Sequence, residues 1–201
     1  LLARPGIYPG SPMLATRALG QNAQYIFCDV DPESVASLRI ASAGLDARVI
    51  KGDGVAAITR AAQLGRVDPA GVLVHIDPFD PHERRAPHSQ TPLELAGWLS
   101  GAGYRVFYWY GYDTVEEQGW ARAAIARRAP DVALWCGDAL IPAPFIYPDR
   151  SGAWGCGVVL ANATRAEMDV CERLGHALER ISAGDRLDGN GPVRLRFEVL
   201  R

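Results

Sequence analysis

Residues 71–81 read GVLVHIDPFDP, an apolar run that ends in an acid and a proline. A short apolar run such as 71–76, bounded by turn residues, is typical of a buried strand. Asp77 follows at the carboxyl end of that strand, and Pro78 then turns the chain. The stretch therefore predicts a strand that delivers a carboxylate to the edge of a sheet. There it serves either as a catalytic group or as the cap of a turn.

Around this strand, short apolar runs alternate with amphipathic stretches along the whole chain. Strands are expected at 25–30, 47–53, 71–76, 104–112, 132–137, 156–162 and 192–200. Helices are expected at 12–19, 31–44, 54–65, 91–103, 114–129 and 164–181, with loops at 80–90 and 141–155. Strands that alternate with helices of about 12 residues predict βαβ units, and so a mostly parallel α/β sheet with helices on both faces. Ligands in such sheets bind at the carboxyl ends of the strands.

Composition narrows the class of protein. The chain has 201 residues and is 48% hydrophobic, which suits a single domain over residues 1–201. A net charge of −2 argues against strong nonspecific binding of nucleic acid, although Arg84 and Arg85 could meet a phosphate or simply lie in a solvated loop. No apolar run reaches the roughly 18 residues that a membrane span needs. The four scattered cysteines predict a reduced, cytoplasmic protein, and no metal site is expected.

Three successive predicted strands end in an acid: Asp29, Asp53 and Asp77, spaced by 24 and 24 residues. In a parallel sheet these side chains meet at one edge and can line one crevice. The first can accept both hydroxyls of a ribose, and the second, followed by Gly54, can accept from the exocyclic amine of a base. The third can face a transferred group. Each acid can instead cap the helix that follows it. Together they resemble the nucleoside-binding edge of a class I S-adenosyl-L-methionine (SAM) methyltransferase.

The chain resembles the RlmJ-type 23S ribosomal RNA adenine-N6 methyltransferases, whose motifs occur here in the family's order over most of the sequence. The matching segments are IYPGSPMLATRAL (7–19), CDVDP (28–32), KGDG (51–54), GVLVHIDPFD (71–80), GYRVFYWYGY (103–112) and SGAWGCGVVLANA (151–163). The YPGSP loop is fairly specific, whereas the isolated acids and the Asp-Gly pair are weak by themselves. The shared order is the strong signal.

This resemblance implies a Rossmann-like class I sheet and direct transfer of a methyl group from SAM to an amine. It assigns cofactor contacts to Ser11, Asp29, Asp53, Gly54 and Asp77, and catalytic roles to Asp77, Pro78 and Phe79. The default acceptor is adenine N6 of ribosomal RNA or DNA, so that nucleic acid is the expected partner and RNA processing the expected context. The family's first strand and its Gly-rich SAM loop have no counterpart in this sequence. The expected sheet therefore lacks its central strand.

One motif departs from the family in a way that bears on the acceptor. The family's Asp-Pro-Pro-Tyr is Asp77-Pro78-Phe79-Asp80 here, so a carboxylate replaces the stacking ring at the fourth position. Phe79 offers a ring one residue earlier, while Asp80 would repel phosphate and favour a small cationic amine. Two alternatives follow: a small-molecule methyltransferase with the same cofactor site, and an inactive methyltransferase-like domain that binds nucleic acid or a partner.

Overall fold

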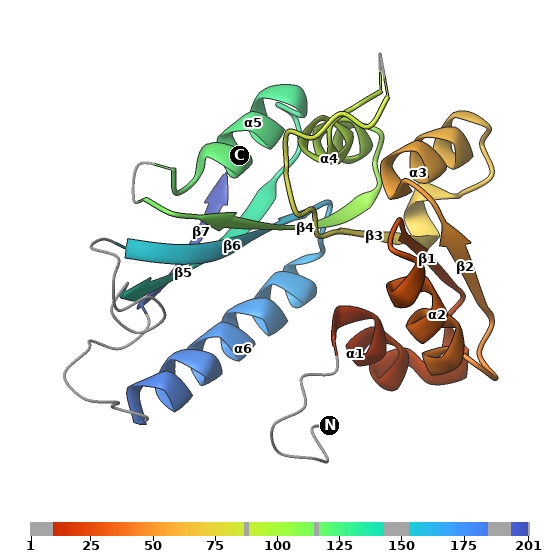
Figure 1. Cartoon of the computed structure of the whole chain (residues 1–201). Coiled ribbons are helices and arrows are strands. Elements are labelled where there is room, and N and C mark those ends of the chain that lie inside the picture. Colours follow the sequence, from red (N-terminus) through yellow and green to blue (C-terminus); the bar gives the residue numbers. More distant parts are fainter. Residues whose placement is uncertain (1–9, 87–88, 115–116, 143–152, 185–193, 201) are drawn as a thin grey trace. The chain divides into compact units, whose positions relative to one another are not determined.

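The computed structural model describes residues 10–86, 89–114, 117–142, 153–184 and 194–200 (Figure 1). The chain forms two compact units, Leu1–Leu64 and Gly65–Arg201. Both contain helices and strands, which confirms the α/β class that the alternating pattern predicts. In the described part of the chain, no helix combines the length and the apolar character that crossing a membrane requires.

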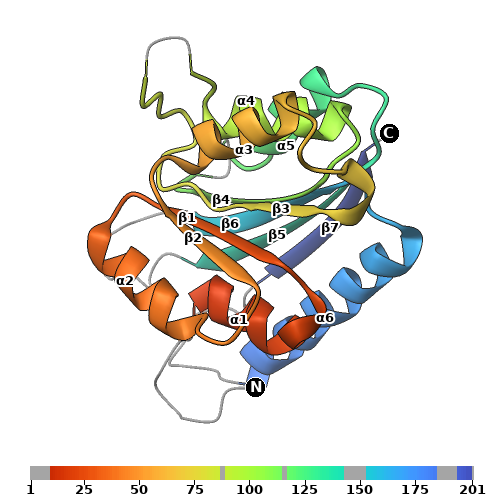
Figure 2. The same cartoon turned by 90° about the vertical axis from the view of Figure 1, so that its right-hand side faces the viewer.

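The N-terminal unit is a pair of parallel strands with helices on both sides. Its elements are α1 (Gly10–Leu19), the short 3-10 turn η1 (Gly20–Asn22), β1 (Tyr25–Asp29), α2 (Pro32–Ala41), β2 (Ala47–Lys51) and α3 (Gly54–Gln63). β1 pairs with β2 in register from Tyr25 opposite Ala47 to Asp29 opposite Lys51. Within this unit, α3 lies on one side of the two strands and α1 and α2 on the other (Figure 2).

Helix starts in this unit follow from local side-chain chemistry. The Asp31 carboxylate accepts from the Ser34 amide at 2.7 Å, and Pro32 occupies the first helical position of α2. Both residues were predicted for these positions, because an acid satisfies the free amides of a helix start and proline has no amide to satisfy. Gly44 follows the helix with φ at +82°, a conformation that favours glycine.

The C-terminal unit holds a five-stranded sheet in the order β3-β4-β6-β5-β7. Its elements are η2 (Pro69–Gly71), β3 (Leu73–Ile76), α4 (Pro92–Gly101), β4 (Arg105–Tyr112), α5 (Trp120–Arg128), β5 (Leu134–Pro142), β6 (Ala153–Ala161), α6 (Arg165–Gly184) and β7 (Arg194–Leu200). Helices α4 and α5 cover one face of this sheet and α6 covers the other (Figure 1). Helices on both faces were expected for the whole sheet, and the C-terminal unit has them.

The core of the C-terminal unit lies on both sides of β4 to β6. Val106, Tyr108, Tyr110 and Tyr112 of β4 are buried on one face, while the alternate residues of the strand are less buried. The buried set shares its layer with Leu95, Leu99, Ile125, Leu134 and Val159. On the opposite face, Trp135, Leu160 and Met168 form a second cluster under α6. This alternation confirms that β4 is a strand with two different faces.

The prediction of a mostly parallel sheet is wrong for the C-terminal unit. β3 and β4 are parallel, but β6 runs antiparallel to both β4 and β5, and β7 is antiparallel to β5. β5 and β6 follow each other along the chain, and consecutive strands pair antiparallel without needing a crossover helix. They also extend beyond their predicted bounds, β5 to Pro142 and β6 from Ala153, within the stretch expected to be a loop.

Helix α5 is shorter than expected because a turn precedes it. The pattern predicts a helix over 114–129, but α5 begins at Trp120. Gly119, with φ at +86°, stands immediately before it, and an added Cβ there would lie 2.6 Å from Nε of Arg122. The Glu117 amide donates to the Thr114 hydroxyl at 3.2 Å and starts the turn. This left-handed junction favours glycine, and the helix does not extend back through it.

Candidate functional site

Asp29 and Asp53 lie at the carboxyl ends of neighbouring parallel strands in the N-terminal unit. One oxygen of the Asp29 carboxylate, Oδ1, accepts from the Asp31 amide at 2.9 Å. The Asp29 carbonyl accepts from the Gly52 amide at 2.9 Å, which continues the strand pairing up to the residue before Asp53. The predicted placement of these two acids at one edge of a parallel pair is therefore present, with the second Asp29 oxygen able to accept a further hydrogen bond.

Asp53 and Gly54 form a tight junction between β2 and α3. Asp53 is the N-cap of α3, and its Oδ1 accepts from the Val55 amide at 3.0 Å. A Cβ added to Gly54 would lie 3.3 Å from the Cβ of Cys28, so the start of α3 packs closely on β1. Burial raises the pKa of the Cys28 thiol, and the nearby Asp53 carboxylate raises it further. Asp53 thus acts as a cap and also carries negative charge beside the end of β1.

Ser11 belongs to a different part of the same unit. It lies half-buried in the first turn of α1, next to Pro12 and Met13. These two neighbours line a small apolar hollow together with Thr16, Phe27, Leu38, Ala41 and Ser42, so that α1 packs on β1 and α2. Tyr8 and Pro9 of the YPGSP motif lie outside the described residues. Ser11 is therefore placed on a helix, whereas the acids stand at strand ends.

Asp77, Pro78 and Phe79 form an exposed turn at the end of β3 in the C-terminal unit. Ile76, the last residue of β3, is buried opposite Tyr108, and Asp77 follows with an exposed side chain. Pro78 is half-buried, and the ring of Phe79 is fully exposed. The strand thus presents a carboxylate and a free aromatic face within three residues of each other.

Asp80 has a structural role in this turn. Its Oδ1 accepts from the His82 amide at 2.8 Å, and its carbonyl accepts from the Glu83 amide at 3.3 Å. This is the local side-chain-to-backbone bonding that aspartate commonly makes in turns. One oxygen of the Asp80 carboxylate is thereby held by the chain itself.

Tyr108 lies in β4 beside the end of β3, and no pattern in the sequence singles it out from the other aromatic residues of that strand. Its side chain is fully buried, and among the described residues its hydroxyl has no hydrogen-bond partner. Burial raises the pKa of this phenol, and the Asp80 carboxylate raises it further. The hydroxyl therefore stays protonated at neutral pH, as an unsatisfied polar group next to the Asp77–Asp80 turn.

The two arginines of the loop at 80–90 are both paired with carboxylates. Arg84 contacts Glu94 at 2.6 Å and Arg85 contacts Glu83 at 2.8 Å. Of the two readings that the sequence leaves open, these pairs favour a self-contained loop over a pair of free phosphate contacts. Glu94 could have been found from the sequence, since Thr91-Pro92-Leu93-Glu94 fits the capping-box pattern. The contact of Glu94 with Arg84 could not have been found from the sequence.

The structure thus brings the predicted residues together in two groups. Asp29, Asp53 and Gly54 gather at the strand ends of the N-terminal unit. Asp77, Pro78 and Phe79 stand together at the end of β3 in the C-terminal unit. In the described ranges the strands of these groups belong to two separate sheets. No cluster of three or more His, Cys, Asp or Glu side chains suited to a metal ion occurs in the same ranges.

Comparison with known proteins shows a likeness to solved structures. No protein-family model matches the chain, and no curated protein does. Among solved structures it is similar to protein LPL1258 from Legionella pneumophila strain Philadelphia 1, a protein of family DUF519, with a TM-score of 0.63 and 18% sequence identity. The match covers 95% of this chain and 66% of that protein, so this chain spans just under two thirds of its length. The likeness is one of α/β fold.

Proposed function

We propose that this chain is a SAM-dependent N-methyltransferase, similar to the RlmJ-type enzymes, that transfers a methyl group to an amine. The observation that carries the proposal is the turn at the end of β3, where Asp77 and Phe79 are both exposed. A carboxylate can orient an amino group, and a free aromatic face can stack on the ring that bears it. This combination at a strand end suits amine methylation better than it suits a turn with a structural role only.

The cofactor would be held by residues of the N-terminal unit. Asp29 has a second carboxylate oxygen for ribose hydroxyls, and Asp53, at the end of the neighbouring strand, has a second oxygen that could accept from the exocyclic amine of the base. These features fit the nucleoside part of SAM, whose sulfonium supplies the electrophilic methyl group. The resemblance adds Ser11 and Asp77 as further contacts.

At the acceptor, the chain's own groups orient the amine and do little covalent chemistry. The Asp77 carboxylate and the Pro78 carbonyl would each accept a hydrogen bond from the amino group, so that its lone pair points at the methyl group. SAM, when bound, would supply the methyl group by direct transfer, with the carbon–nitrogen bond replacing the carbon–sulfur bond, and the amine would release one proton to solvent. Correct alignment accounts for most of the expected acceleration.

The acceptor favoured by the turn is a base that has left its stack, as in adenine of RNA or DNA. Bases in single-stranded or splayed conformations stack on aromatic side chains, and Phe79 provides such a ring. A small-molecule amine remains the second candidate, because Arg84 and Arg85 beside the turn are engaged by Glu94 and Glu83 and so contribute little free positive charge.

Sheet topology supports the class I proposal. That fold requires a central strand flanked by parallel neighbours, and in the described ranges β1 and β3 each pair on one edge alone, with β2 and β4. Apolar side chains on both strands are exposed, Ile26 on β1 and Leu73 on β3. Apolar strands with an open edge are what the class I proposal leads us to expect at these positions.

The cofactor assignment predicts that Asp53 has two roles, helix cap and cofactor ligand, which substitutions can separate. Asp53→Ser keeps an N-cap oxygen for the Val55 amide but removes the carboxylate, whereas Asp53→Ala removes both. We expect isothermal titration of the full chain with SAM to show binding to the wild type and at least tenfold weaker binding to both variants. Asp53→Ala alone should lose about 1 kcal/mol of unfolding free energy. Absence of SAM binding to the wild type would contradict the proposed function.

The acceptor assignment predicts a stacking role for Phe79. Phe79→Leu keeps an apolar side chain and removes the ring, so we expect the acceptor KM to rise about tenfold, in line with roughly 1–3 kcal/mol for base–aromatic stacking. Phe79→Trp should retain wild-type kinetics, since it keeps a flat face. Because the side chain is fully exposed, neither variant should alter thermal unfolding. Equal KM values for the leucine and tryptophan variants would exclude stacking.

A further inference from the structure

The segment that follows the turn at Asp77, Pro78 and Phe79 contacts the helices of its own unit. We call residues 80–86 and 89–91 the strap. The Pro81 carbonyl accepts from the Leu93 amide at 3.4 Å, which ties the strap to the first turn of α4. The His82 ring packs on the ring of Trp120 at the start of α5, with centroids 5.0 Å apart. The exposed turn at Asp77 is therefore held between β3 on one side and these tethers on the other.

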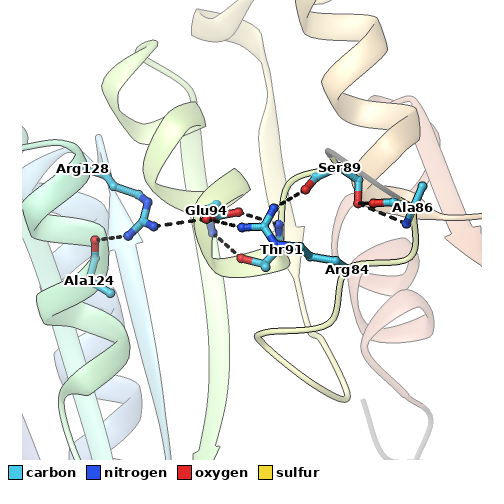
Figure 3. A network of polar contacts seen from close by, with 7 residues as sticks. All are labelled: Arg84, Ala86, Ser89, Thr91, Glu94, Ala124 and Arg128. Atoms are coloured by element: carbon cyan, nitrogen blue, oxygen red, sulfur yellow. Dashed lines mark hydrogen bonds and ion pairs between the residues drawn. The ribbon is translucent and has the colours of Figure 1, made fainter.

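Arg84 and Glu94 form the strongest of these tethers (Figure 3). Nη2 of Arg84 lies 2.6 Å from Oε1 of Glu94, and its Nη1 donates to the Ser89 carbonyl. Arg84 thus joins the near part of the strap to its far end and to α4 in one contact. A charged pair at this distance is more directional than the long Pro81–Leu93 hydrogen bond.

Glu94 is itself held rigidly in the network. Its Oε2 accepts from the Thr91 amide at 3.0 Å, and the Thr91 hydroxyl accepts from the Glu94 amide at 3.1 Å, which completes a capping box at the start of α4. Arg128 of α5 contacts Oε1 at 3.5 Å (Figure 3). The Thr91 amide, followed by Arg84 and Arg128, lowers the pKa of the Glu94 carboxyl. Arg84 therefore binds a carboxylate that is fixed from several directions.

Arg85 provides an internal comparison. It is the next residue along the strap and carries the same charge, but its contacts are with Glu83, two residues away, at 2.8 and 3.1 Å. That pair lies within the strap and ties it to no helix. Two adjacent arginines thus differ in whether they anchor the strap.

We propose that Arg84 and Glu94 are positioning residues that hold the Asp77–Asp80 turn in the conformation that receives the acceptor. The role in the reaction rests on the proposed function. The anchoring of the strap to α4 does not depend on it. Exposed ion pairs add little to global stability, and the Arg84 side chain is 49% exposed. Loss of the pair should therefore loosen the strap locally and leave the rest of the unit folded.

Hydrogen–deuterium exchange of the full chain tests the anchoring without any assay of activity. In Arg84→Ala we expect the His82 and Leu93 amides to exchange about tenfold faster than in the wild type, with an unchanged melting temperature. Glu94→Gln should act in the same direction, because glutamine can still complete the capping box but cannot pair with Arg84. Arg85→Ala is the control and should exchange like the wild type. Equal exchange in the two arginine variants would overturn the inference.

Steady-state methyl transfer then tests the positioning role. Arg84→Ala should lower kcat about tenfold and leave the SAM dissociation constant unchanged, whereas Arg85→Ala, which removes the same charge, should retain the wild-type kcat. Equal loss in both variants would point to simple attraction of a nucleic acid and would overturn the positioning role. A wild-type protein that transfers no methyl group would instead contradict the proposed function, and the exchange result would still decide the anchoring.

Discussion

Asp77→Ala is expected to reduce methyl transfer by about a hundred- to a thousandfold, the usual range for loss of a preorganised polar group at a reacting centre. The carboxylate follows β3 directly, so its position is set by the paired strand up to Ile76. Asp77→Asn keeps one oxygen that can accept from the amine and should retain more activity than the alanine variant. Single-turnover measurements with saturating SAM and adenine-containing RNA provide the comparison.

The same variant should have almost no effect on folding. Asp77 is exposed at the end of a strand, and surface substitutions usually change the free energy of unfolding by less than about 0.5 kcal/mol. Asp80→Ala is the matched control, because it removes a carboxylate three residues away that accepts from the His82 amide. It should cost stability and retain more turnover than Asp77→Ala. Wild-type turnover in Asp77→Ala would identify Asp77 as a turn residue and favour an inactive binding domain.

Local chemistry explains why much of the fold could be predicted from the sequence. The start of α2 depends on Asp31 and Pro32, and that of α3 on Asp53, all of which act within three residues. The two faces of β4 follow from alternation alone. The even spacing of Asp29, Asp53 and Asp77 reflects repeated strand–helix units, so their positions at strand ends could also be predicted.

The strand order and the contacts between residues far apart in the chain could not be predicted from the sequence. The insertion of β6 between β4 and β5 is decided by which apolar faces pack best, and no short pattern encodes it. The contact of Arg84 with Glu94 joins residues ten positions apart and depends on how the strap folds back on α4. Likewise, each acid could be assigned to a strand end, but the sheet to which each strand belongs could not.

The largest effect on stability is expected at Asp138, in the middle of the C-terminal core. Its side chain is fully buried, accepts from the Tyr110 hydroxyl at 2.5 Å and pairs with Arg122 at 2.9 Å. Burial, followed by this hydrogen bond, raises the pKa of Tyr110. Asp138→Ala leaves a buried hydroxyl unpaired and deprives a mostly buried guanidinium of its main partner, which typically costs about 3–5 kcal/mol.

In Asp138→Ala, Arg122 keeps Glu198 as a second carboxylate at 3.1 Å. We therefore expect a loss of unfolding free energy near the lower end of that range, about 3 kcal/mol, which lowers the melting temperature by roughly 6–12 °C for a chain of this size. Asp169→Ala breaks the exposed pair with Arg165 and is the control, with an expected change below about 0.5 kcal/mol. Thermal and urea unfolding of both variants measure the difference. Adding Arg122→Met to Asp138→Ala should recover part of the loss, because the mostly buried guanidinium is then gone and Glu198 keeps Arg196 as a partner at 3.5 Å. Failure of this second substitution to recover stability would assign the cost to the Tyr110 hydroxyl and the cavity, and not to the ion pair.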